Sequence, residues 1–153
     1  MTYRTHILGG VAAAAIITTV SARGCLEFLP PLSTPAVFGS FVAAMIGSIL
    51  PDIDQPTSMV GKTLPIISRL MRGAFGHRGF CHSLLFLALI YGITMTLFSS
   101  MKFYALVLCL GAGSHLLFDM FNRPGIPLLW PLKIQFRLAK IKTESQFGTK
   151  RSC

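Results

Sequence analysis

The chain has 153 residues, of which 52% are hydrophobic and only 12% are charged, and its mean hydropathy is +0.64. Soluble domains carry about 25% charged residues, so this composition excludes an ordinary soluble domain and indicates a membrane protein. The net charge of +9 favours anionic surroundings, either lipid headgroups or nucleic acid.

Four stretches without charged residues are candidates for membrane-spanning helices. A bilayer core about 30 Å thick needs roughly 20 apolar residues per helix, with about 17 to 25 as the usual range. In chain order the stretches are 5–22, 28–51, 79–101 and 103–118, and they hold 18, 24, 23 and 16 residues. The fourth extends to Phe121 if Asp119 is tolerated near its end. We therefore predict an all-α fold with four transmembrane helices.

The first stretch also fits a cleaved signal peptide. Arg4 would be its basic start and Val20-Ser21-Ala22 an acceptable cleavage site. We favour a helix that stays in the mature protein, because His6 lies directly before the apolar run. The other histidines and the aspartates described below are expected to share a site with it.

The basic residues set the expected orientation. Four spans place both termini and the loop 52–78 on one side of the membrane, and that side holds twelve of the 14 lysines and arginines. By the positive-inside bias, this side is cytoplasmic. The same bias accounts for most of the net charge, and no nucleic-acid-binding motif accompanies it, so we expect no nucleic-acid partner.

The ionisable residues of the apolar regions share one location in this topology. The chain has only four histidines and five acidic residues, and seven of these nine groups fall near the cytoplasmic end of a span. Glu27 and Glu144 are the two left over. The seven residues are His6, Asp52, Asp54, His77, His82, His115 and Asp119.

His115 and Asp119 are four residues apart, a spacing that puts two side chains on the same face of a helix. A carboxylate on an apolar helix normally faces the bundle interior, where a partner or a metal offsets its cost. The pair is therefore either a shared ion-binding unit or a simple hydrogen-bonded structural pair.

Asp52 and Asp54 lie between Pro51 and Pro56, where the second helix is expected to end. In an extended segment, residues two apart point the same way. We therefore expect both carboxylates at one site, either as two metal ligands or as one ligand and one partner of a ligand histidine. A plain helix-end cap is the alternative for either residue.

His77 and His82 open the third span, and at least one of them is expected to bind metal. Imidazole and carboxylate together suit zinc, manganese or iron better than calcium or magnesium. The number of ligands allows one or two ions, and a pair of ions suits hydrolysis. Arg78 and Arg123 lie beside this group and are either clamps for an anionic substrate or topology charges.

Residues 64–75, "LPIISRLMRGAF", have the pattern of an amphipathic helix. One face is assigned the apolar residues and another the two arginines, which predicts an interfacial helix in the middle cytoplasmic loop, lying over the site. The apolar residues are Leu64, Ile67, Leu70, Met71 and Phe75, and the arginines are Arg69 and Arg72. Residues 1–132 are expected to form one transmembrane helical domain, and 133–153 a basic cytoplasmic tail. The four cysteines have no metal-binding spacing and are assigned no role.

Five segments in order, "THILGG", "GSILPDID", "HRGFCHS", "GSHLLFD" and "RPGIPLLWPL", resemble the YdjM-like family of bacterial inner-membrane proteins, described as metal-dependent hydrolases. The order of histidines and aspartates is also distantly similar to that of zinc-dependent phospholipase C. The resemblance implies an inner-membrane location and a metal site. It departs from the phospholipase C order because no histidine follows His115.

These observations together predict a metal-dependent hydrolase of the phosphoester class, acting on a lipid or lipid-linked phosphate at the cytoplasmic face. Zinc is the expected metal, with one or two ions. The expected metal ligands are His6, Asp52, Asp54, His82, His115 and Asp119, the expected catalytic residues are His77 and Asp54, and the expected substrate-binding residues are Arg78 and Arg123. The alternative is a non-catalytic membrane protein in which a structural metal or hydrogen bonds hold the same cluster.

Overall fold

The computed structural model describes residues 3–24, 33–76, 79–97, 101–121, 125–132 and 134–138. Over these residues the fold is all-helical, and the β-pairing within them is a single bridge between Ile126 and Phe136. The elements are α1 (Tyr3–Ala22), α2 (Thr34–Ile49), η1 (Leu50–Asp54), α3 (Met59–Thr63), α4 (Pro65–Phe75), η2 (Phe80–His82), α5 (Leu84–Leu97) and α6 (Lys102–Met120).

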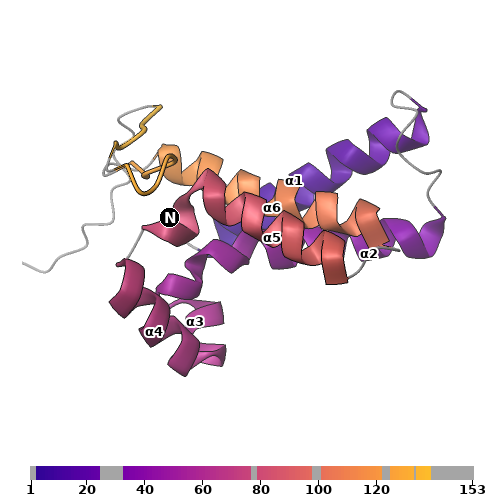
Figure 1. Cartoon of the computed structure of the whole chain (residues 1–153). Helices are drawn as coiled ribbons and strands as arrows, with labels where there is room; N and C mark the ends of the chain where they lie inside the picture. The colour runs from indigo at the N-terminus through magenta and orange to yellow at the C-terminus, as the bar shows by residue number, and fades with distance from the viewer. Residues whose placement is uncertain are drawn as a thin grey trace, which may run out of the picture.

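Three helices, α1, α2 and α6, pack against one another as the central bundle, and α5 lies along α6 (Figure 1). The start of α1, the end of α2, the start of α5 and the end of α6 meet at the same end of this bundle. The short elements η1, α3 and α4 lie beyond that end, to one side. Six of the polar residues singled out in the sequence, those that the structure describes, are therefore carried to one end of the bundle.

Small residues let the central helices approach closely. A Cβ added to Gly111 would lie 2.1 Å from the carbonyl oxygen of Ala44, and one added to Gly47 would lie 2.0 Å from that of Leu108. Such contacts are typical of membrane helices, where packing between small residues replaces the hydrophobic driving force. The close approach fixes the register of α2 against α6, and with it the position of the end of α2 beside the last turns of α6.

Few of the described apolar side chains are fully buried, and many large ones are exposed on the outer faces of the bundle. Ala14, Ala44 and Val107 form the buried core, whereas large residues such as Phe38 and Leu97 are exposed on the outer faces. This is the distribution expected of a bundle surrounded by lipid.

Three helical segments are long and apolar enough to cross a membrane, namely Tyr3–Ala22, Thr34–Asp54 and Lys102–Met120. The third expected span, 79–101, is represented by α5, which has only 14 residues and is about 21 Å long at 1.5 Å per residue. Its helix begins late because residues 79–83 form a turn around η2. The amphipathic helix expected at 64–75 is present as α4.

The glycine contacts give a matched pair of mutations in α6. Gly111→Ala is expected to lower the free energy of unfolding by about 1–3 kcal/mol, because the new methyl group overlaps the backbone of α2. The melting temperature of the purified protein should fall accordingly. Gly113→Ala, two residues away, meets nothing within 4 Å and should leave stability unchanged or slightly higher. Equal melting temperatures for the two variants in the same detergent would contradict this packing.

Candidate metal centre

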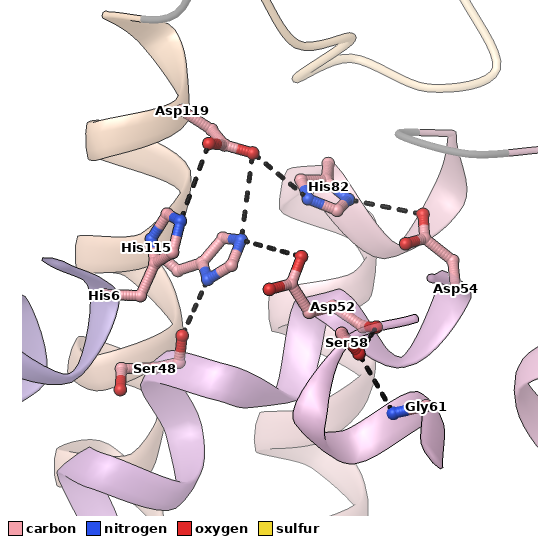
Figure 2. A network of polar contacts seen from close by, with 9 residues as sticks. All are labelled: His6, Ser48, Asp52, Asp54, Ser58, Gly61, His82, His115 and Asp119. Atoms are coloured by element: carbon pink, nitrogen blue, oxygen red, sulfur yellow. Dashed lines mark hydrogen bonds and ion pairs between the residues drawn. The ribbon is translucent and has the colours of Figure 1, made fainter. Parts of the chain in front are cut away.

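Six of the predicted site residues meet at the end of the bundle where α1 begins and α6 ends (Figure 2). They come from four elements: His6 from α1, Asp52 and Asp54 from η1, His82 from η2, and His115 and Asp119 from α6. The other predicted site residues, His77, Arg78 and Arg123, lie outside the described residues.

The cluster is almost completely buried. The side chains of His82, His115 and Asp54 are fully buried, and those of His6 and Asp119 are 4% exposed. Asp52 is the exception, with a side chain that is 25% exposed. Burying the carboxylates of Asp54 and Asp119 without compensation is expensive, so the cluster favours a balancing positive charge, from protonated histidine or from a metal ion.

The distances between the imidazole nitrogens and the carboxylate oxygens fit metal ligands better than hydrogen bonds. The separations across the cluster run from 3.3 Å between His82 Nε2 and Asp119 Oδ2 to 3.8 Å between His6 Nε2 and Asp119 Oδ1. An N–H···O hydrogen bond spans about 2.7–3.2 Å. Two ligand atoms that each lie about 2.0–2.1 Å from one tetrahedral zinc ion are instead roughly 3.3 Å apart.

Potential ligand atoms also converge in threes. His6, His115 and Asp119 form one group, and Asp52, His82 and His115 form another, with the ligand atoms of each group within 4.8 Å of one another. Both groups combine imidazole and carboxylate, the donor set that suits zinc. The described residues therefore fit a divalent metal.

His115 is held in the orientation that a ligand needs. Its Nδ1 lies 2.6 Å from the carbonyl oxygen of Ser48 and donates to it, which leaves the lone pair of Nε2 directed into the cluster. Nε2 is buried and makes no hydrogen bond with the described residues, and it is 3.8 Å from Asp119 Oδ2. The i,i+4 pair therefore converges on a common space without forming a direct hydrogen bond.

His6 reaches the same space from α1. Its ring stacks on that of His115, with ring centroids 3.8 Å apart and an interplanar angle of 18°. Two stacked imidazolium rings would repel each other, so this arrangement suits neutral rings, the form that binds metal. The approach of α1 depends on Gly10, where a Cβ would lie 2.7 Å from the carbonyl oxygen of Ala44.

The "PDID" segment is a 3₁₀ turn and not the extended segment from which the two carboxylates were expected to point the same way. With three residues per turn, side chains two apart diverge. Asp52 Oδ1 lies 3.7 Å from His115 Nε2, whereas Asp54 Oδ2 lies 3.4 Å from His82 Nδ1. The Ser58 hydroxyl donates to the carbonyl oxygen of Asp52 and stabilises the turn. Asp52 therefore contacts His115, and Asp54 contacts His82 (Figure 2).

His82 lies between two carboxylates, with Asp54 on its Nδ1 side and Asp119 on its Nε2 side. Burial lowers the pKa of His82, but the carboxylates of Asp119 and Asp54 outweigh it and raise that pKa to about 9. Without a metal, the ring is therefore protonated at neutral pH and balances the two anions. The adjacent Cys81 is inert, because burial raises the pKa of its thiol to about 12.

An aromatic cluster next to His82 was not predicted from the sequence. The Phe80 ring packs against Phe75, Phe86 and Trp130, with centroid distances of 5.0, 5.5 and 5.4 Å. Trp130 joins this cluster from the segment after α6. These contacts fix η2 and hence His82. No sequence periodicity marks them, because each ring comes from a different short element.

The comparisons with known proteins agree with this architecture. A family model described as "YdjM inner membrane protein" matches residues 1–151. The chain is 36% identical over 138 residues to the uncharacterized protein YvsG of Bacillus subtilis, covering 90% of this chain and 78% of that protein. It is 34% identical over 145 residues to the inner membrane protein YdjM of Escherichia coli, covering 90% of this chain and 69% of that protein.

The Shigella flexneri protein of the same name matches to the same extent. No solved structure matches the chain. The family match over nearly the whole chain, together with the apolar helices, supports a location in the bacterial inner membrane. The chain belongs to the YdjM family of inner membrane proteins.

Proposed function

We propose that this membrane protein is a metal-dependent hydrolase that acts on a phosphoester of a lipid or lipid-linked substrate. The single observation that supports it is the buried cluster, in which histidines and aspartates from four elements converge at separations of 3.3–3.8 Å. Hydrolytic metal sites use this donor set.

The proposed ligands are His6, Asp52, His82, His115 and Asp119, and the proposed metal is zinc. The proposal allows one or two ions, and His115 belongs to both groups of potential ligands. Since Ser48 occupies the Nδ1 of His115, only its Nε2 remains, so His115 would bind one ion and a second ion would depend on the other ligands.

Asp54 was predicted as a ligand and as a catalytic residue, and its contact with His82 suggests how it acts. Its buried carboxylate faces the Nδ1 of His82, the arrangement in which an aspartate orients a metal-binding histidine. We propose Asp54 as a positioning residue, with direct ligation as the alternative. His77 as the proton-handling catalytic group, and Arg78 and Arg123 as substrate clamps, remain proposals from the sequence.

A divalent ion bound in the cluster would act as a Lewis acid toward a phosphoryl oxygen and would make a bound water more acidic. The protein's part is to hold the ligands rigidly and to admit the substrate on one side. Asp52 is the partly exposed member of the cluster, so we propose that substrate enters there, at the end of the bundle where a lipid phosphate would lie.

The finer membrane arrangement is part of the same proposal. We propose that α5 completes a fourth crossing, that both termini are cytoplasmic and that α4 lies at the membrane surface. Residues 133–153 then form a basic tail on the cytoplasmic side. Support comes from the apolar character of α5 and from the excess of basic residues in the segments assigned to that side.

A second candidate is a non-catalytic protein whose cluster only fixes helix packing. Deep burial favours it, because five of the six side chains are at most 4% exposed. A protonated His82 already balances two carboxylates without any metal. Metal content and turnover separate the two candidates.

Purified protein is expected to contain about one or two equivalents of zinc by elemental mass spectrometry. Asp119→Asn and His115→Ala should each lower the zinc affinity at least 10- to 100-fold, because ligand removal is costlier than loss of a supporting partner. Ser114→Ala is the matched control, since its hydroxyl donates to the carbonyl oxygen of Gly111 within α6 and zinc should be retained. Metal-free wild-type protein would contradict the proposal.

Turnover distinguishes a catalytic from a structural ion. Zinc-loaded protein in detergent micelles should hydrolyse bis(p-nitrophenyl) phosphate or a short-chain lipid phosphoester, and Asp119→Asn should abolish the activity. If zinc removal lowers only the melting temperature, and no phosphoester from a broad panel is hydrolysed, the structural candidate is correct.

The pH dependence of metal-free protein tests the role of His82. Because folding raises its pKa from 6.5 to about 9, its stabilising contribution is complete below pH 6.5 and is lost as the pH rises toward 9. Chelator-treated wild-type protein should therefore melt at progressively lower temperature between these pH values. His82→Gln should be less stable at pH 6.5 and show a flatter profile; parallel profiles for the two proteins would refute the assignment.

A further inference from the structure

Helix α4 turns an apolar stripe away from the protein. Ile66 and Leu70 are 80% and 69% exposed, and with Gly73 they lie on one face at positions i, i+4 and i+7. The opposite side holds the helix in place, because Ser68 is fully buried and Phe75 packs against Phe80. The sequence pattern had placed Leu70 and Phe75 on one face, whereas the structure separates them.

Basic side chains border this stripe. Arg69 and Arg72, at positions i and i+3, form the next row around the helix, and Lys62 is exposed at the end of the preceding α3. No acidic residue occurs between Gln55 and Gly76 in the sequence, so these charges have no neighbouring acid within that segment. We call the exposed residues Lys62, Ile66, Ile67, Arg69, Leu70 and Arg72 the α4 outer face.

The α4 outer face lies at the end of the bundle that carries the metal cluster, displaced to one side of the central helices (Figure 1). Helix α4 packs on η1, the turn that supplies Asp52 and Asp54, and Arg72 Nη1 lies 3.4 Å from Gln55 Oε1 just beyond that turn. An apolar stripe with a basic border at the end of a membrane bundle suits the headgroup region of a bilayer.

We infer that the α4 outer face binds the anionic phospholipids of the leaflet next to the metal cluster, with Ile66 and Leu70 inserted among the acyl chains and Arg69 and Arg72 at the phosphates. This inference rests on the proposed membrane arrangement. The apolar stripe favours a non-aqueous partner, and the basic residues beside it favour an anionic one. An anionic bilayer surface satisfies both, and each basic residue near such a surface favours the anionic lipid about fivefold.

Quenching by brominated lipids tests the inference in the reconstituted full chain. Trp130 is the single tryptophan, so a Trp130→Phe background carrying Leu70→Trp reports on the α4 outer face alone. The bilayers are phosphatidylcholine with a minority of phosphatidylglycerol, and either lipid carries the bromine at the same mole fraction. Brominated phosphatidylglycerol should quench this tryptophan several-fold more than brominated phosphatidylcholine does. Adding Arg69→Gln and Arg72→Gln should remove the difference.

Leu110→Trp in the same background is the matched control. Leu110 is exposed on α6 within a membrane-spanning segment, so both brominated lipids should quench it equally. Equal quenching at Leu70 would overturn the anionic preference. No quenching at Leu70 would overturn membrane contact altogether, whether water or a second copy of the chain covers the helix.

If Trp130→Phe fails to fold, a bimane label on Leu70→Cys replaces the tryptophan at that position, and its quenching by the brominated lipids is measured instead. Trp130 is then retained, and Cys25 and Cys153 are changed to serine. Zinc content measured on the same samples keeps the two proposals separate. Zinc retained without lipid quenching refutes only the α4 inference. Selective quenching without zinc refutes only the metal centre.

Discussion

The arrangement of the described helices depends on neutralising three aspartates at one end of an apolar bundle. A buried carboxylate without a counter-charge costs several kcal/mol, and lipid offers no solvation for it. Asp54 and Asp119 both lie within 3.4 Å of His82, and His115 faces Asp52 and Asp119. Residues far apart in sequence are therefore held together by charge balance, and the helix ends that carry them must meet.

Close helix packing makes this balance geometrically possible. Because Gly111 and Ala44 bring α6 and α2 into backbone contact, the carbonyl oxygen of Ser48 reaches the ring of His115. That single hydrogen bond orients the Nε2 of His115, and the stacked ring of His6 follows it. Small residues in the middle of the bundle thus determine the orientation of the imidazole rings at its end.

The location of the cluster could be predicted from the sequence, because scarce histidines and aspartates at the ends of apolar stretches can only meet at one side. His115 and Asp119 followed from helical spacing alone. The divergence of Asp52 and Asp54 could not be predicted, since prolines mark a turn without specifying a 3₁₀ geometry. The outward face of α4 and the rings around Phe80 depend on tertiary contacts between short elements, which leave no periodic signal.

An anomalous difference map recorded at the zinc edge from crystals of the purified protein tests the central claim most directly. The account predicts a peak about 2.0–2.2 Å from His115 Nε2 and from a carboxylate oxygen of Asp119. A map without a peak, with His82 Nδ1 and Nε2 drawn to within hydrogen-bond distance of Asp54 and Asp119, would show that a proton and not a metal balances the buried carboxylates.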